Sequence, residues 1–309
     1  MKAMRYHAYG DSHVLVYEDT DPPVAGPGQV VVRVAGTSFN LVDALIRAGL
    51  LQEVFPVALP HIPNLDVAGV ITQVGQGVSR WRAGDAVVAF LPMTAPGAAA
   101  EYVAAPAEAL AAAPRTVQLA DAAALPLTGL AAWQALFDHA KVKAGQRVLI
   151  NGAGGAVGGY AVQLAKRAGA TVTATASARS IGRIRSYRAD RIVDYTATPV
   201  PQALAGQRFE VVLNLVSVNP EQTAQLVGLV ADGGAFASTT PFPQDAGRGK
   251  RTVRVLVRSD AAQLAELVAR VDAGELKINV AERRPLTDLA AVHEEAAAGR
   301  LAGKTVLIP

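Results

Sequence analysis

A glycine-rich segment, GAGGAVG at residues 152–158, has the spacing of a loop that binds phosphate groups. Gly152, Gly155 and Gly158 form the pattern GxxGxxG, a variant of the dinucleotide-binding fingerprint. Glycine permits a tight turn and a close approach of backbone to pyrophosphate, and the first N–H groups of a following helix attract that anion. The alternative is that these glycines serve only the turn or helix packing. A strand-like run before the loop and a helical pattern after it favour a dinucleotide site.

The residues after this loop distinguish between the two nicotinamide dinucleotides. An NAD site usually has an acidic residue about 20 residues further on, which binds the ribose 2′-OH. Residues 159–189 contain no Asp or Glu and six basic side chains. Ser177 and Arg179, which follow the second strand-like run, suit a 2′-phosphate because it accepts charge-assisted hydrogen bonds. We therefore predict NADPH, and we assign Arg185 and Arg188 to a solvated helix face.

Alternating strands and helices must position this loop. Strand-like runs occur at residues 147–151, 171–176, 191–195, 209–216, 234–238 and 252–257. Helical patterns separate most of them, at residues 157–168, 179–188 and 221–231. Six strands with such crossovers predict an α/β fold with a doubly wound, six-stranded parallel sheet.

The first part of the chain has a different pattern. Short Val-rich runs between Gly and Pro residues predict a barrel-like β domain over residues 1–120, with one short helix at 41–49. The parallel-sheet domain is expected at 121–262. Because a last strand must pair with another strand, we expect residues 263–309 to return to the first domain.

Composition excludes several classes of protein. The chain is 51% hydrophobic and 18% charged, which is typical of a globular protein, and its net charge of +3 gives little support for nucleic-acid binding. No secretory signal or membrane-spanning apolar run is present, so we expect a cytoplasmic protein without a membrane partner. The absence of cysteine excludes disulfides and Cys-bearing zinc sites, and the five histidines lack metal-site spacing.

Several ordered motifs resemble the zinc-independent quinone oxidoreductases of the medium-chain dehydrogenase/reductase superfamily. They are NLVDALIRAG (40–49), IPNLDVAGVITQVGQGVSRWRAGDAVVAF (62–90), AAALPLTGLAAWQAL (122–136), GAGGAVGGYAVQLAKRAGA (152–170) and AVHEEAAAGRLAGKTVLIP (291–309). The resemblance implies a GroES-like catalytic domain, a Rossmann domain with the cofactor in the cleft between them, and a homodimer. Leu65 stands where the zinc-binding branch has His, so the resemblance implies no metal. Asn64 replaces a usual Gly, which suits a positive φ angle.

The resemblance also implies roles for individual residues. Asn40 and Asp43 match an Asn-x-x-Asp segment beside the nicotinamide and are the predicted catalytic residues. Asp43 could instead pair with Arg47, and Asn40 could cap the short helix. The predicted cofactor contacts are Asn40, Thr128, Gly152, Ala153, Gly155, Ala156, Val157, Gly158, Ser177, Arg179, Tyr195, Val216, Ser217, Ser238, Thr239 and Thr240.

The expected reaction is hydride transfer from NADPH to a quinone without zinc. One alternative is reduction of an enone, an alkenal or an enoyl thioester, in which Tyr102, Asn40 or a cofactor hydroxyl would stabilise the enolate. For a thioester, a carrier phosphate would be bound by Arg248, Lys250 and Arg251. A second alternative, an NADPH-binding or RNA-binding protein with little turnover, rests only on the basic stretch 247–258.

Overall fold

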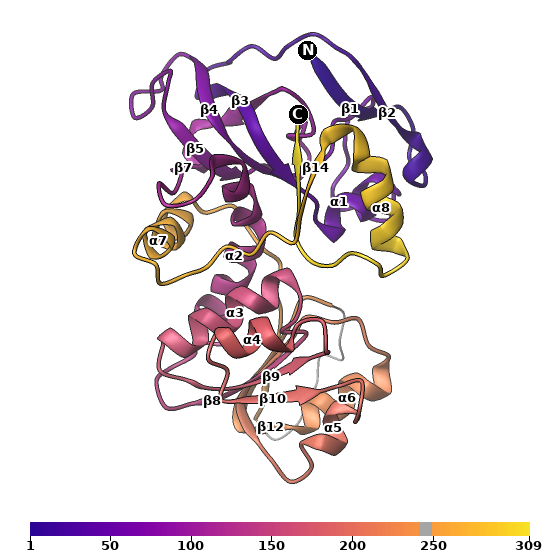
Figure 1. The fold of residues 1–309 in the computed structure, drawn as a ribbon, viewed down its shortest axis with the longest axis vertical. Coiled ribbons are helices and arrows are strands. Elements are labelled where there is room, and N and C mark those ends of the chain that lie inside the picture. Colours follow the sequence, from indigo (N-terminus) through magenta and orange to yellow (C-terminus); the bar gives the residue numbers. More distant parts are fainter. Residues whose placement is uncertain (241–248) are drawn as a thin grey trace. The chain divides into compact units, whose positions relative to one another are not determined.

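The computed structural model describes residues 1–240 and 249–309 (Figure 1). It divides into two compact units. Unit 1 comprises Met1–Leu127 and Ser259–Pro309, and unit 2 comprises Thr128–Arg258. No helix in the described part of the chain is long and apolar enough to cross a membrane.

Unit 1 is built on a largely antiparallel sheet. Its strands are β1 (Lys2–Tyr6), β2 (Leu15–Asp19), β3 (Gln29–Ser38), β4 (Asp66–Val74), β5 (Ala86–Phe90), β6 (Tyr102–Pro106), β7 (Leu110–Ala112), β14 (Glu282–Pro285) and β15 (Thr305–Ile308). The main sheet has the order β14-β15-β3-β4-β5-β7, with β6 paired to β3, whereas β1 and β2 form a separate hairpin. Alternate residues of β3, Val30, Val32 and Val34, face the core because side chains alternate along a strand.

The C-terminal tail completes unit 1. The helices of unit 1 are α1 (Leu41–Arg47) and, in the tail, α7 (Ala261–Asp272) and α8 (Leu289–Ala297). Short 3₁₀ segments of unit 1 occur at Ser12–Val14, Ala107–Ala109, Leu119–Ala124 and Leu286–Asp288. The last strand, β15, pairs antiparallel with β3, where Val306 lies opposite Ser38. Helix α8 lies beside the N-terminal hairpin (Figure 1), and its Leu289 and Val292 share a core with Tyr6. The two ends of the chain therefore fold together.

Unit 2 has the predicted six-stranded parallel sheet. Its strands are β8 (Arg147–Asn151), β9 (Thr171–Ala176), β10 (Arg191–Asp194), β11 (Phe209–Asn214), β12 (Val230–Ser238) and β13 (Arg251–Arg254). They follow the order β10-β9-β8-β11-β12-β13, and each neighbouring pair is parallel. Its helices are α3 (Ala156–Arg167), α4 (Ile181–Ser186), α5 (Val200–Ala203) and α6 (Pro220–Gly228). Helices α3 and α4 cover one face and α5 and α6 the other (Figure 1). This is the doubly wound arrangement.

Helix α2 (Pro126–Trp133) spans the boundary between the units and continues as a π-helical segment, Gln134–His139. Several expected element limits in unit 2 were wrong, including the end of the last strand, since β13 ends at Arg254 and not at residue 257. Helix α6 ends at Gly228 and β12 begins at Val230, because Val230 already pairs with Phe209 of β11. Strand β11 ends at Asn214, whose side chain bonds to the turn that follows.

Candidate functional site

The glycine loop joins β8 to α3 at the carboxyl edge of the parallel sheet. Gly152 has a φ of 91°, and its N–H donates to Thr175 Oγ1 at 2.8 Å. A Cβ atom at Gly158 would lie 2.5 Å from the Cα of Ala153, which is itself fully buried. Glycine is therefore required at Gly152 by conformation and at Gly158 by the close approach of helix to loop.

The start of α3 offers free backbone donors. Gly155 precedes the helix in an extended conformation, so Ala156, Val157 and Gly158 are its first three residues. Their N–H groups have no acceptor within the helix. Gly155 is exposed, and the side chains of Ala156 and Val157 are only partly covered. These donors and the helix dipole can hold a pyrophosphate, so the loop fits a dinucleotide.

A chain of side-chain hydrogen bonds supports the loop from the neighbouring strands. Asn151 Nδ2 donates to Asn214 Oδ1 at 2.9 Å, and Asn214 Nδ2 donates to the Val216 carbonyl at 3.0 Å. The same amide lies 3.3 Å from Ser238 Oγ and 3.2 Å from Thr240 Oγ1. The ends of β8, β11 and β12 are thereby joined.

The predicted contacts after β11 and β12 gather at this edge. The side chain of Val216 lies against Gly152, where an added Cβ would be 2.7 Å from Val216 Cγ2. Thr239 N–H donates to the Asn214 carbonyl at 3.1 Å. Ser217 is exposed beside Val216. The structure thus brings these residues close to the glycine loop, as parallel strands require.

The region predicted for the 2′-phosphate follows β9. Ser177 is half-buried, its N–H lies 3.3 Å from Ser180 Oγ, and Arg179 is exposed. Tyr195 follows β10 and is 51% exposed. The prediction did not single out Arg183, whose guanidinium donates to the carbonyl of Gly154 within the glycine loop. The sequence offered one signal: Arg183 is four residues from Arg179 in a helical pattern, so both were expected on one helix face.

The first acidic residue after the loop is already engaged. Asp190 accepts hydrogen bonds from Lys166 Nζ at 2.7 Å and from Val172 N–H at 2.6 Å. Arg185 and Arg188 are exposed, in agreement with the solvated face assigned to them. Asp190 is therefore committed to structural contacts, whereas Ser177 is half-buried and Arg179 is exposed.

A second polar cluster lies inside unit 1. It consists of Asn40, Asp43, Asp66 and Lys304, which come from three separate parts of the chain and are all buried. Asn40 Nδ2 donates to Asp66 Oδ2 at 2.8 Å, and Lys304 Nζ donates to Asn40 Oδ1 at 2.6 Å. Lys304 Nζ and Asp66 Oδ2 form an ion pair at 3.2 Å. Asn40 is thus the centre of a buried network.

Asp66 anchors this network to neighbouring elements. Its Oδ2 also accepts from Ser38 Oγ at 2.6 Å, and its Oδ1 accepts from the N–H of Leu127 at 2.8 Å. Lys304 donates in addition to the Phe39 carbonyl at 3.0 Å. The charged atoms of Asp66 and Lys304 therefore all have hydrogen-bond partners, as burial demands.

Asp43 has an unusual protonation equilibrium. Its Oδ2 accepts the N–H of Asn40 at 2.8 Å, one half of a capping box for α1. Burial raises the pKa of Asp43 to about 7; the charge of Asp66 adds to this, whereas the Asn40 N–H and Lys304 oppose it. Arg47 donates instead to the Gly10 carbonyl at 2.7 Å and to His293 Nδ1 at 3.2 Å. The alternative ion pair between the described residues Asp43 and Arg47 therefore does not form.

The prediction missed Asp66 and Lys304. Asp66 is the one charged residue in the apolar run NLDVAGVI, and Lys304 lies in a GKT sequence directly before the last strand. A charge in an otherwise buried strand was the available signal. The prediction for Asn64 is confirmed, since its φ is 72°. Neither polar atom of its buried amide has a hydrogen-bond partner.

Other predicted residues lie in or beside α2, β6 and β13. Thr128 is buried in α2, and Tyr102 is half-buried in β6. Lys250 Nζ donates to the Val227 carbonyl, and Arg251 donates to the Ala140 carbonyl. Arg248 lies outside the described residues.

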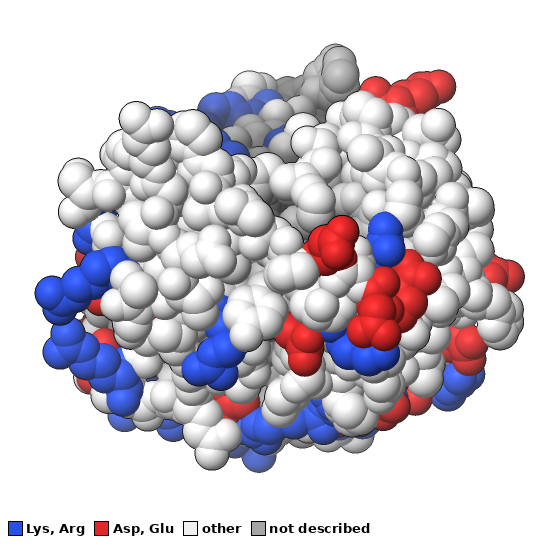
Figure 2. Space-filling view, turned by 90° about the horizontal axis from the view of Figure 1, so that it is seen from above, with Lys and Arg blue, Asp and Glu red and all other residues white. Residues whose placement is uncertain are grey.

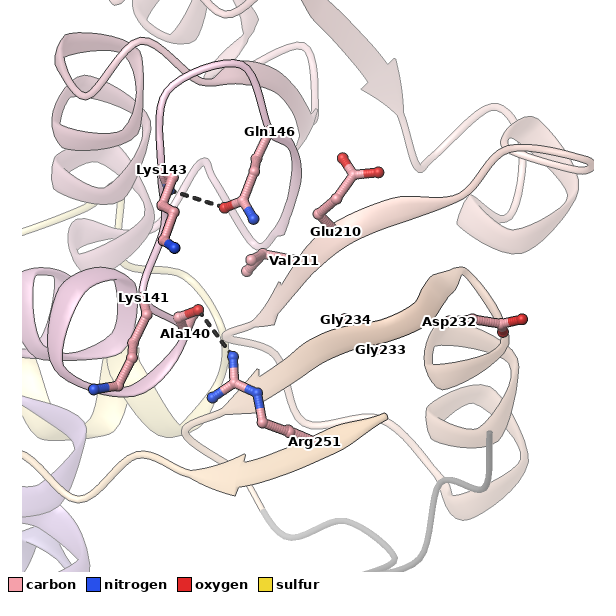
Figure 3. Close-up of a pocket in the computed structure, with 10 residues that line it drawn as sticks. All are labelled: Ala140, Lys141, Lys143, Gln146, Glu210, Val211, Asp232, Gly233, Gly234 and Arg251. Atoms are coloured by element: carbon pink, nitrogen blue, oxygen red, sulfur yellow. Dashed lines mark hydrogen bonds between the residues drawn. The ribbon is translucent and has the colours of Figure 1, made fainter. Parts of the chain in front are cut away.

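A cavity of about 280 Å³ lies elsewhere in unit 2 (Figure 3). It is lined by Gln146, which precedes β8, by Val211 of β11 and by Arg251, the first residue of β13. These residues are at the amino ends of the parallel strands. Because ligands of such sheets bind at the carboxyl ends, this cavity is not where a dinucleotide is expected.

Charge and metal-ligand patterns restrict the chemistry further. On the face in Figure 2, basic and acidic side chains intermingle among broad uncharged areas, and the described residues there form no continuous basic surface. Within residues 1–240 and 249–309, no group of three or more His, Cys, Asp or Glu is placed to hold a metal ion.

Comparison with known proteins agrees with this architecture. Residues 26–115 match the alcohol dehydrogenase GroES-like domain, and residues 187–307 match the zinc-binding dehydrogenase family. The chain is 33% identical, over its whole length and 98% of the relative, to a chloroplast envelope quinone oxidoreductase homolog of Arabidopsis thaliana. The chain belongs to the quinone oxidoreductase family of the medium-chain dehydrogenase/reductase superfamily. Its GroES-like unit 1 and Rossmann unit 2 form the fold of that family.

Two further relatives bear on function. The structure of the quinone oxidoreductase from Coxiella burnetii has a TM-score of 0.88, with 27% identity over 100% of this chain and 99% of that one. An NADPH-dependent alkenal/one oxidoreductase of Arabidopsis thaliana is 32% identical over 92% of this chain and 73% of the relative. This quinone oxidoreductase family member is thus an oxidoreductase that shares the nicotinamide-binding architecture of its superfamily.

Proposed function

We propose that this protein is an NADPH-dependent quinone reductase that acts without zinc. The observation that carries the proposal is the open glycine loop, followed by Ser177 and Arg179 with the next acidic residue, Asp190, engaged by Lys166. A carboxylate at the ribose would repel a 2′-phosphate, whereas a guanidinium and a hydroxyl would bind it. The chain also lacks cysteine, the usual ligand of zinc in related sites.

In this proposal, the two units have different tasks. The N–H groups of Ala156, Val157 and Gly158 bind the pyrophosphate. Arg183 restrains the glycine loop through the Gly154 carbonyl. Val216, Ser238 and the threonines after β12 line the route of the cofactor along the sheet edge, and Tyr195 contacts the adenosine phosphate.

The reacting end is assigned to unit 1. NADPH, when bound, supplies the hydride. Asn40 and Asp43 contact the nicotinamide side, and Thr128 of α2 contributes a hydroxyl there. For a quinone acceptor, no protein acid is essential, because solvent can protonate the hydroquinone anion. The protein therefore needs chiefly to orient the two reactants and to exclude water.

Matched arginine variants test the cofactor assignment. We expect Arg179→Ala to raise the KM for NADPH by about 10- to 100-fold, the value of a charge-assisted hydrogen bond, and to leave the KM for NADH within about twofold. Arg185→Ala removes an exposed arginine from the same helix pattern and should change neither KM. Equal loss for both cofactors in Arg179→Ala would contradict a 2′-phosphate contact.

Reduction of a carbon–carbon double bond is the second candidate. The alkenal/one oxidoreductase of Arabidopsis thaliana supports it, since that relative is 32% identical over 92% of this chain, against 33% over the whole chain for the quinone oxidoreductase homolog. A linear enone and 1,4-benzoquinone should be compared at equal concentration with NADPH. Preference for the quinone supports the first proposal, whereas turnover of the enone alone would replace it with this candidate.

A homodimer is also proposed. Strand β13 forms an open edge of the parallel sheet, because it pairs only with β12 among the described strands. An open edge provides unpaired backbone donors and acceptors for a second copy. Light scattering after size exclusion should give twice the chain mass of 32.0 kDa. A monomer at micromolar concentration would contradict this part of the proposal.

A further inference from the structure

The side-chain amide of Asn40 is fixed at both ends. Its nitrogen donates to the Asp66 carboxylate at 2.8 Å, and its oxygen accepts from the Lys304 ammonium at 2.6 Å. A 180° rotation of the amide would place N–H groups against the ammonium and the oxygen against the carboxylate. Such a rotation would lose both hydrogen bonds and create two repulsive contacts. The ion pair therefore selects one of the two amide orientations.

The amide still has capacity for another partner. Its oxygen also faces the Asp43 N–H in the capping box, but its second N–H is directed only to the Ser38 carbonyl at 3.5 Å, the outer limit of a hydrogen bond. Asn40 can thus keep both charged partners and also bind a ligand.

The last strand is held by backbone pairing as well as by the ion pair. Strand β15 is already paired through its backbone to β3 and to β14. The side chains of Lys304 and Asp66 are 4% and 0% exposed, and removing two charges from water is costly. Because backbone pairing already attaches the strand, the buried pair can serve another role.

We propose that Lys304 and Asp66 are positioning residues that hold the Asn40 amide in the orientation in which it meets the nicotinamide. The inference rests on the proposed function, because contact between Asn40 and the nicotinamide is part of that proposal. Lys304 acts through the Asn40 oxygen and Asp66 through its nitrogen. The residue that leads into the C-terminal strand, where no cofactor contact is predicted, thereby supports the reacting end of the site.

A double-mutant cycle in the full-length protein tests this role. With NADPH and 1,4-benzoquinone, we expect Lys304→Met to lower kcat about tenfold and to change the KM for NADPH less than about twofold. In an Asn40→Ala background, the same change should alter kcat by less than about twofold, because Lys304 acts through Asn40. Independent, multiplicative losses would overturn the proposal.

Two further variants separate positioning from folding. Lys2→Met removes an exposed lysine that pairs with Asp19 in the same unit, and it should leave kcat unchanged. If Lys304→Met does not fold, the cycle is run with Lys304→Met combined with Asp66→Asn, which removes both charges and leaves an acceptor for Asn40. The kcat loss should again disappear in the Asn40→Ala background.

A spectroscopic readout separates failure of this inference from failure of the proposed function. In ¹⁵N-labelled protein, the Asn40 side-chain amide pair, identified by its loss in Asn40→Ala, should exchange slowly with solvent. We expect Lys304→Met, or the charge-free pair, to accelerate that exchange at least about tenfold as the restraint is lost. Slow exchange that persists in these variants would overturn the positioning role, even if the wild type reduces no acceptor. Accelerated exchange with unchanged kcat would also overturn it while leaving the quinone reductase proposal intact.

Discussion

The glycine loop of unit 2 and the Asn40 cluster of unit 1 are built in opposite ways. The loop is made of backbone N–H groups within seven consecutive residues and is open to ligand. The cluster is made of side chains from residues 40, 43, 66 and 304, all of them buried, with Asn40 the most exposed at 6%. One site therefore depends on local conformation, whereas the other depends on the whole of unit 1 being assembled.

The two sites therefore depend on different parts of the fold. Backbone donors at a helix start exist as soon as β8, the loop and α3 have formed, and they need no particular side chain. The Asn40 amide is oriented only when the last strand has paired with β3. Changes in the loop should thus affect ligand binding, and changes in the cluster should affect folding and catalysis together.

The largest effect is expected from Lys304→Met. The substitution leaves the Asp66 carboxylate buried without its counter-ion, which should reduce the free energy of unfolding by about 3–5 kcal/mol. Urea denaturation at pH 7 measures it. A loss below about 1 kcal/mol is typical of an exposed ion pair and would contradict a buried charge pair in the cluster.

Gly158→Ala should produce the next largest effect. The added Cβ would meet the backbone of Ala153 at 2.5 Å, so the loop must shift away from its binding geometry. We expect the Kd for NADPH to rise at least about 100-fold, or about 2.7 kcal/mol, as measured by titration of NADPH fluorescence. Gly182→Ala is the control, since a Cβ there meets nothing within 4 Å. Similar binding by both variants would show that the loop tolerates displacement.

Asp43→Asn should change how stability depends on pH. The carboxyl has a pKa of about 7 in the folded protein against a reference value of 3.8, so between these values the folded state holds a proton that the unfolded state has lost. The stability contributed by Asp43 therefore falls as pH rises through this window, by up to about 1.4 kcal/mol per pH unit.

The comparison of wild type with Asp43→Asn isolates this contribution. Burial lowers the pKa of His61 to about 4 and that of His293 to about 3, which makes stability rise with pH over part of the same range. Both histidines are present in both proteins, so their effects cancel in the difference. Stability is measured by urea midpoints at pH 5, 6, 7 and 8. The stability of wild type relative to Asp43→Asn should fall between pH 5 and pH 7 and level off by pH 8. Parallel curves for the two proteins would rule out a raised pKa.

The smallest effect is expected from Lys166→Met. This lysine also pairs with an aspartate, Asp190 at 2.7 Å, but the two side chains are 25% and 41% exposed. Solvent screening should limit the loss of stability to about 1 kcal/mol or less, and added salt should reduce it further. A loss as large as that of Lys304→Met would show that burial does not distinguish the two ion pairs.

The two regions also differ in what the sequence could reveal. The glycine loop was predictable because a strand, three spaced glycines and a helix follow one another directly. The parallel sheet was predictable because strand-like runs and helical patterns alternate along the chain. The start of β12 was not predictable, because Val230 begins the strand by pairing with Phe209 of another strand. The cluster depends on contacts between distant residues, such as Asn40 with Asp66, 26 positions apart, and Lys304 with Asp66, 238 positions apart. No local pattern encodes these contacts. The role of Arg183 likewise became clear from its contact with Gly154, since its spacing from Arg179 does not identify that partner.

The most direct test of the central claim is the rate of NADPH oxidation by purified wild-type protein with 1,4-benzoquinone, measured beside NADH. We predict quinone-dependent turnover with kcat/KM for NADPH at least about 10-fold above that for NADH, the contribution of one charge-assisted contact to the 2′-phosphate. Equal or better use of NADH, or no quinone-dependent oxidation of either cofactor, would contradict the assignment of an NADPH-dependent quinone reductase.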